Sequence, residues 1–146
     1  MNDDTISIET DFNAPLEKVW AAWTEPHLLL KWFGSDPNGK GLRATMSVQV
    51  GGTYEITFQD SNGTQHTCMG KYLIVEKNKI LSFTWEWKNE PGLESLVTIT
   101  FNPKQRKTSM IFEHRNVGFA SAHNYLAGWE ATFSKLERML SDISLQ

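Results

Sequence analysis

The sequence of 146 residues has little cysteine, little excess charge and no long apolar run, and each shortage excludes a class of protein. Its single cysteine, Cys68, cannot build a disulfide framework, and the N-terminus carries no signal-peptide pattern, so we expect a reducing, cytoplasmic setting. Fourteen Lys and Arg against 17 Asp and Glu give a net charge of −3, which argues against a nucleic-acid partner. No segment approaches the ~20 uninterrupted apolar residues that cross a bilayer, and no basic block would hold the chain on an anionic membrane. We therefore expect a soluble protein with neither nucleic acid nor a membrane as its partner.

Aromatic residues, in contrast, are abundant, because the chain has six Trp, eight Phe and three Tyr. Large rings bring much apolar surface, and Tyr and Trp also carry polar tips that need hydrogen-bond partners. A chain of this length is expected to fold as one domain, residues 1–146, and to bury a sizeable core without a disulfide or metal. Since such a core does not demand so many rings, they either fill it or line a hollow within it.

The spacing of apolar residues predicts an α+β domain. Ile6–Phe12 alternates like a strand, and Pro15 and Pro26 each begin a short helix. From Leu42 to Val117 the period is two, with turn residues between the apolar runs, which indicates an antiparallel meander. After Gly118 the period becomes that of one long C-terminal helix, whose apolar stripe is Ala122, Leu126, Trp129, Phe133, Leu136, Leu140 and Ile143.

Each strand of the meander offers one apolar row, so one face of the sheet is expected to be buried against the long helix. Several turns are legible, among them Gly51-Gly52, which separates the expected strands Met46–Val50 and Tyr54–Phe58, and Asn62-Gly63. A curved sheet wrapped around a helix leaves a widened end, where a pocket is expected. The predicted inward rows are Tyr54/Ile56/Phe58, Met69/Leu73/Val75, Leu81/Phe83/Trp85/Trp87, Val97/Ile99/Phe101 and Met110/Phe112/His114.

Motifs for nucleotide binding, metal binding or catalysis are weak. The loop Gly34–Gly41 nearly matches a phosphate-binding loop, but a helix precedes it, a strand follows it and Gly41 lacks the hydroxyl. A flexible lid or connector, which could gate a neighbouring pocket, is the better interpretation. The four histidines lack metal-ligand spacing, and no nucleophile motif is present. His66 and Cys68 share one strand row, which we assign to the outer face. The sequence therefore predicts no metal, no cofactor and no catalytic residue.

The candidate site is a ligand pocket with a nearly uncharged interior. His114 is either a hydrogen-bonded core histidine or a polar anchor for a ligand. Packing in the core and lining the pocket remain equally open for six rings, namely Trp32, Phe33, Trp85, Trp87, Tyr125 and Trp129. If Trp129 is packed core, Trp129→Ala should cost about 3–5 kcal/mol, and much less if it borders an open pocket. The candidate ligand-binding residues are Trp32, Phe33, Tyr54, Ile56, Phe58, Met69, Trp85, Trp87, Met110, Phe112, His114, Tyr125 and Trp129.

Several segments, in this order and spacing, resemble the family of homologues of the activator of heat-shock protein 90 ATPase, within the START-like (SRPBCC) superfamily of birch-pollen-allergen-like proteins. The resemblance covers nearly the whole chain and implies a helix-grip fold, in which a curved antiparallel sheet holds a long C-terminal helix around a hydrophobic cavity, with two short helices after the first strand. The matching segments are Ala14–Trp20, Trp23–Pro26, Trp32–Gly34, Gly51–Tyr54, Gly70–Leu73, Leu81–Trp85 and Gly128–Trp129 with Leu136.

Relatives in the superfamily bind lipids, sterols, polyketides or other aromatic molecules, and a minority are enzymes. The leading hypothesis is therefore the binding of a small hydrophobic molecule, aromatic or lipid-like, oriented by Tyr125 and His114. A polyketide cyclase or hydrolase that uses Tyr125, His114 or Tyr54 as acid or base is an alternative. A chaperone-accessory or regulatory partner protein is another, although the resemblance links that role to longer relatives with an extra N-terminal domain.

Overall fold

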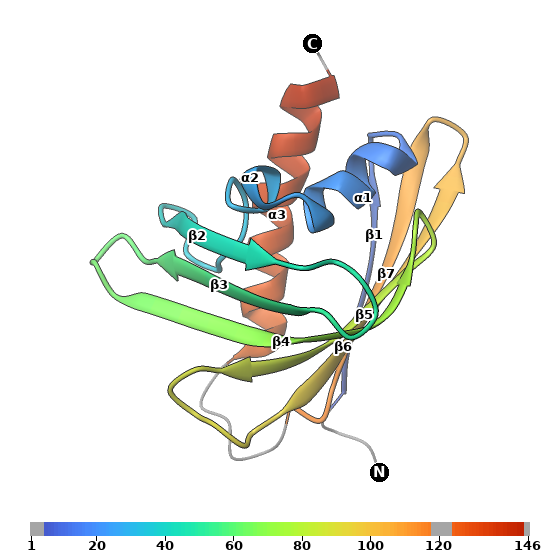
Figure 1. Ribbon diagram of the computed structural model, residues 1–146. Coiled ribbons are helices and arrows are strands. Elements are labelled where there is room, and N and C mark those ends of the chain that lie inside the picture. Colours follow the sequence, from blue (N-terminus) through green and yellow to red (C-terminus); the bar gives the residue numbers. More distant parts are fainter. Residues whose placement is uncertain (1–4, 118–123, 145–146) are drawn as a thin grey trace.

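An antiparallel sheet of seven strands curls around one long helix in the computed structural model, which describes residues 5–117 and 124–144 (Figure 1). Two short helices, α1 and α2, follow the first strand, and the long helix α3 ends the fold. The elements are β1 (Thr5–Phe12), α1 (Leu16–Thr24), α2 (Pro26–Leu29), β2 (Lys40–Met46), β3 (Thr53–Gln59), β4 (Gln65–Glu76), β5 (Ile80–Trp87), β6 (Ser95–Lys104), β7 (Lys107–Arg115) and α3 (Tyr125–Ser144).

The strand order in the sheet is β1-β7-β6-β5-β4-β3-β2, so the first strand pairs with the last and the others follow each other as a meander. Helix α3 lies in the concavity of the sheet, and α1 and α2 lie together beside it (Figure 1). This is the α+β helix-grip fold that the sequence predicts, and that prediction is confirmed. Among the described residues, no helix combines the length and the apolar character needed to cross a membrane.

The turns follow the predicted chemistry with one correction. In the β3–β4 hairpin, Gly63 adopts a φ of 94° and the Asn62 side chain accepts a hydrogen bond from the Thr64 N–H. The strand expected at Met46–Val50 is instead β2, which ends at Met46, and residues 47–52 turn back toward β3. The reason is that Ser47 N–H bonds to the Thr53 carbonyl, which closes the turn early and leaves Val50 exposed.

The prediction for β4 was wrong over its first half. Cys68 and Tyr72 are buried, whereas Leu73 is 44% exposed, so the inward row is the one assigned to the outer face. A β-bulge between Tyr72 and Ile74 adds one residue to β4 against β5 and reverses the alternation, because side-chain direction has a period of two. Beyond the bulge Val75 packs against the core, as expected.

Aromatic rings from most of the helices and strands fill the interior. Trp23 of α1 lies 4.8 Å from Trp32, measured between ring centroids, and Phe112 of β7 lies 5.0 Å from Phe133 of α3. The helix stripe is confirmed at Trp129, Phe133, Leu136 and Leu140, which are buried. Leu126 is 46% exposed and was wrongly placed on that stripe, while Ala122 lies outside the described residues and the side chain of Ile143 is not described.

Candidate functional site

A pocket of about 150 Å³ lies where the first turns of α3 meet the loop after α2 and strands β3, β4 and β5. Its wall is mostly aromatic, and among the described residues that line it none is a carboxylate or an amine. The lining residues are Phe33, Gly34, Ser35, Phe58, His66, Trp85, Trp87, Asn124, Tyr125, Gly128, Trp129 and Thr132.

The structure divides the thirteen predicted site residues into three groups. Those that line the pocket are Phe33, Phe58, Trp85, Trp87, Tyr125 and Trp129. Those that are buried in the core away from the pocket wall are Trp32, Tyr54, Ile56, Met110, Phe112 and His114. Met69 faces the convex side of the sheet, among Thr53, Glu55 and Glu86, and its inward placement was wrong because of the reversed alternation in β4.

The pocket wall is built around Trp85 at the centre of β5. Its ring centroid lies 5.2 Å from that of Trp129, 5.3 Å from that of Trp87 and 6.1 Å from that of Phe33. Phe58 closes the side toward β3, 5.6 Å from Phe33 and 6.1 Å from Trp87. Rings at these separations contact each other directly and form a continuous aromatic wall along the pocket.

Tyr125, the first residue of α3, brings a polar group to this wall. Its hydroxyl oxygen accepts a hydrogen bond of 2.6 Å from the indole N–H of Trp87. Burial raises the pKa of Tyr125, and the neighbouring indoles of Trp87 and Trp85 oppose that rise. The indole N–H of Trp85 lies near the same oxygen, but it makes no hydrogen bond within the described part of the chain. Tyr125 is therefore a neutral phenol that joins α3 to β5.

His114 is a core histidine whose two ring nitrogens are both engaged. Nδ1 accepts the indole N–H of Trp129 at 3.1 Å, so the ring proton resides on Nε2 and is donated to Ser95 Oγ at 2.7 Å. The Ser95 hydroxyl in turn lies 3.3 Å from the Trp85 carbonyl, to which it donates. Burial lowers the pKa of His114 to about 3. His114 thus holds Trp129, a residue of the pocket wall, in place from behind the pocket. Neither of its ring nitrogens is available to a ligand.

Tyr54 is also unsuited to the acid or base role considered for it. It is buried, its hydroxyl donates to the Thr84 carbonyl at 2.6 Å, and burial raises its pKa well above the ordinary range. Burial likewise raises the pKa of the Cys68 thiol, so this cysteine is an inert part of the core.

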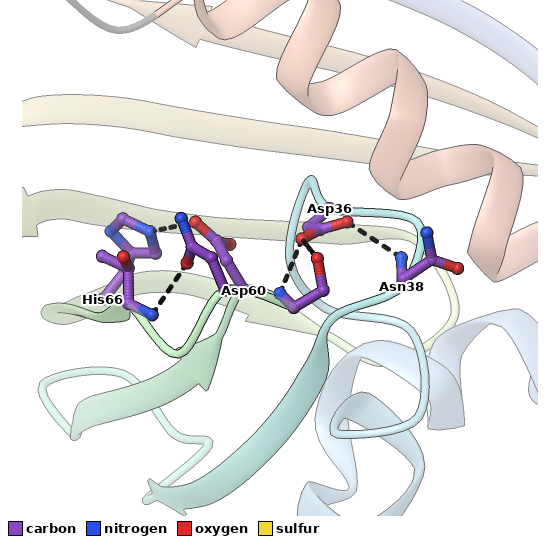
Figure 2. A network of polar contacts seen from close by, with 7 residues as sticks. Asp36, Asn38, Asp60 and His66 are labelled. Carbon is purple, nitrogen blue, oxygen red and sulfur yellow. Dashed lines mark hydrogen bonds and ion pairs between the residues drawn. The ribbon is translucent and has the colours of Figure 1, made fainter.

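His66 is a pocket-lining residue that the sequence interpretation missed. It lines the pocket with its ring centroid 5.3 Å from that of Phe58 and 6.1 Å from that of Trp87. Its Nε2 lies 2.8 Å from a carboxylate oxygen of Asp60, across the β3–β4 hairpin (Figure 2). If the alternation of β4 is interrupted by a bulge, and does not run through one regular strand, His66 is expected on the inward face.

The loop between α2 and β2 borders the pocket and is held in place by hydrogen bonds to Asp36. One carboxylate oxygen accepts the Asn38 N–H and the other accepts both the N–H and the hydroxyl of Ser61 in the β3–β4 hairpin (Figure 2). These hydrogen bonds, led by the Ser61 N–H, lower the pKa of Asp36. Lys135 of α3 donates to the Asp36 carbonyl at 2.9 Å. The expected connector is therefore held against both the hairpin and the helix.

At Gly34 the same loop touches the pocket wall directly. Its φ is 115°, and a Cβ added there would lie 2.9 Å from Cδ2 of Phe58. Only glycine suits such a backbone conformation and such a close approach. Among the described residues, no three His, Cys, Asp or Glu side chains gather closely enough to hold a metal ion.

Fold and pocket together define a helix-grip protein with a ring-lined pocket at the beginning of its C-terminal helix. The family described as "Activator of Hsp90 ATPase homolog 1-like protein" matches residues 13–141, and the chain belongs to that family. A comparison with curated proteins found no match.

Solved structures extend this likeness over the whole fold. An AHSA1-like protein from Aeromonas hydrophila is 20% identical with a TM-score of 0.82, covering 97% of this chain and 95% of its own. A protein from Mesorhizobium loti is 30% identical with a TM-score of 0.72, covering 94% and 97%. DynU16, a protein of the dynemicin biosynthetic locus, is 23% identical with a TM-score of 0.78, covering 95% of this chain and 48% of DynU16.

Proposed function

We propose that this protein binds a small hydrophobic molecule of single-ring size in the pocket between β5 and the first turns of α3. The observation that carries the proposal is the cavity of about 150 Å³ bounded by Phe33, Phe58, Trp85, Trp87 and Trp129. A pocket of this volume has room for about one benzene ring, whereas pockets for drug-sized ligands run to about 300–1,000 Å³. The lipids and polyketides bound by relatives in the superfamily are larger than this space.

The affinity should be modest. Burial of ~200 Å² of apolar ligand surface contributes about 5 kcal/mol at ~25 cal/mol per Å² before the cost of association. Without that cost, 5 kcal/mol corresponds to a dissociation constant of about 0.2 mM, so a ring without polar groups should bind in the millimolar range or more weakly.

The test is a titration with toluene, a three-ring flavonoid and a fatty acid, recorded on the indole N–H resonances. Toluene should shift the resonances of Trp85, Trp87 and Trp129, which line the pocket, and leave that of Trp32 in place. Trp32 is an internal control because it is fully buried and donates to the Ala22 carbonyl at 3.1 Å. Absence of any shift with toluene, or equal shifts at Trp32, would contradict the proposal.

An enzyme that acts on such a ligand is the second candidate. The paired His66 and Asp60 at the pocket wall, 2.8 Å apart, favour it, because a carboxylate that orients a histidine is a common arrangement for proton transfer. The likeness to DynU16, from a biosynthetic locus, supports the same direction. Turnover of a bound ligand that is lost in Asp60→Asn, with ligand binding retained, would establish this candidate over a carrier.

A further inference from the structure

The polar atoms of the pocket wall limit which ring the pocket takes. Asp60 accepts a hydrogen bond from Nε2 of His66, since a carboxylate can only accept, so a neutral His66 carries its proton on Nε2. Nδ1 is then a lone-pair acceptor, and it has no partner in the part of the chain that the structure describes. A neutral His66 on this wall therefore accepts a hydrogen bond and cannot donate one.

This arrangement is held in place from both sides. Asp60 belongs to the turn of the β3–β4 hairpin, where its N–H bonds to the Thr64 carbonyl and its carbonyl accepts the Gly63 N–H. The His66 ring is packed against Phe58 and Trp87. Neither partner has to reorganise to meet a ligand, which reduces the cost of binding.

The charges around the pocket mouth are of both signs and give an anionic ligand no clear advantage. The carboxylates of Asp60 and Asp36 lie on the two segments that border the mouth. The half-buried ammonium group of Lys135 donates to the Asp36 carbonyl, and it interacts electrostatically with both carboxylates and with Arg138. A neutral ring with a hydroxyl group meets the lone pair of His66 without needing a charge at the mouth.

We propose that the ligand of this pocket is a single-ring phenol, with its ring among Phe58, Trp85 and Trp87 and its hydroxyl donating to Nδ1 of His66. This inference rests on the proposed function and specifies the chemical class of its ligand. His66 is the binding residue, and Asp60 is a positioning residue that keeps the acceptor nitrogen available.

The experiment compares toluene, phenol and anisole at about pH 8. Anisole has an oxygen that accepts but no hydroxyl proton to donate. In His66→Phe, which keeps a ring beside Phe58 and Trp87, phenol should bind about 3- to 10-fold more weakly, as loss of one hydrogen bond implies. Toluene and anisole should bind within about 2-fold of their wild-type affinity. His27→Phe, at an exposed histidine of α2, is the matched control and should change none of the three affinities.

Asp60→Asn gives an independent test that does not remove the imidazole. The Asn side chain can either accept from Nε2 or donate to it, so the ring proton is no longer confined to Nε2 and Nδ1 is an acceptor for only part of the time. Phenol should weaken by less than in His66→Phe, while toluene stays unchanged. In the wild type, the ¹⁵N resonance of His66 Nδ1 should move on addition of phenol and stay in place on addition of toluene.

The outcomes separate the two proposals. If toluene binds but phenol affinity is the same in the wild type, His66→Phe and Asp60→Asn, the phenol assignment is wrong and the ring pocket stands. If anisole weakens together with phenol in His66→Phe, the nitrogen is a donor and the assignment is again wrong. If none of the three probes binds the wild type, the proposed function itself fails.

Discussion

The two ends of the space between the sheet and α3 contain aromatic rings at similar separations and differ in whether a pocket lies beside them. At the closed end the separations run from 4.6 Å for Phe112 and Trp129 to 6.4 Å for Trp23 and Phe112. At the open end the separations between neighbouring wall rings run from 5.2 Å for Trp85 and Trp129 to 6.1 Å for Phe58 and Trp87. The distances between ring centroids are therefore alike, and the pocket of about 150 Å³ at the open end is what distinguishes it from the filled core.

The two ends also differ in how their histidines are bonded. Behind the pocket wall, His114 uses both ring nitrogens, on Trp129 and on Ser95. At the open end His66 uses one nitrogen on Asp60 and lines the pocket. One histidine therefore holds the rings together, and the other has a ring nitrogen available for the ligand that we propose.

The largest expected effect is at the boundary between the two ends. Trp129→Ala should lower the free energy of unfolding by about 3–5 kcal/mol, because the ring is packed on Phe112 and Phe133 and its N–H is bonded to His114. Trp87→Ala, at the open end, should cost about 1–2 kcal/mol, because one side of that half-buried ring already faces the pocket. Urea denaturation of both variants measures the difference, and similar losses would contradict the division into two ends.

A smaller effect is expected from His114, which stays unprotonated in the folded protein over a range where an unfolded histidine binds a proton. Its pKa is lowered to about 3 by burial, whereas an unfolded histidine titrates near ~6.5. Between these values only the unfolded state binds the proton, so the histidine's contribution to stability is complete above about pH 6.5 and falls by about 1.4 kcal/mol per pH unit as the pH drops below it.

The check is the pH dependence of urea unfolding between about pH 6 and pH 4. His114→Gln keeps one donor and one acceptor but does not titrate, so its stability should fall less steeply than that of the wild type over this range. Parallel profiles for the two proteins would show that His114 is not held neutral by the fold.

Gly34 tests the open end with a smaller change. Gly34→Ala should cost about 1–3 kcal/mol because of its positive φ, and its Cβ should push Phe58 and weaken toluene binding. Gly51→Ala is the matched control, since Gly51 also has a positive φ of 86° but nothing lies within 4 Å of an added Cβ. Gly51→Ala should lose stability with unchanged toluene affinity. Equal toluene affinities in the two variants would show that Gly34 does not shape the pocket.

Much of the fold was predictable because its periodicity is regular. The alternation in β5, β6 and β7 and the stripe at Trp129, Phe133 and Leu136 place their residues correctly. Alternation failed in β4, where a bulge near Tyr72 changes the phase and no local sequence signal marks it.

The candidate site was harder to predict than the fold. Composition shows that rings are abundant, but whether a ring such as Trp32 or Trp85 packs or lines a space depends on distances between elements far apart in sequence. His114 was left open between core and anchor, and its partners Ser95 and Trp129 decide for the core. His66 was missed for two reasons. The direction of its side chain depends on the phase of the alternation in β4, and its partner Asp60 lies in the turn between β3 and β4.

The most direct test of the account is a crystal structure of the protein soaked in iodobenzene, with the iodine located by its anomalous scattering. The account predicts one occupied position, among Phe58, Trp85 and Trp87, and no iodine near Trp23 or Trp32. Iodine between the rings at the closed end, or a pocket that remains empty while the crystal holds iodobenzene elsewhere, would contradict it.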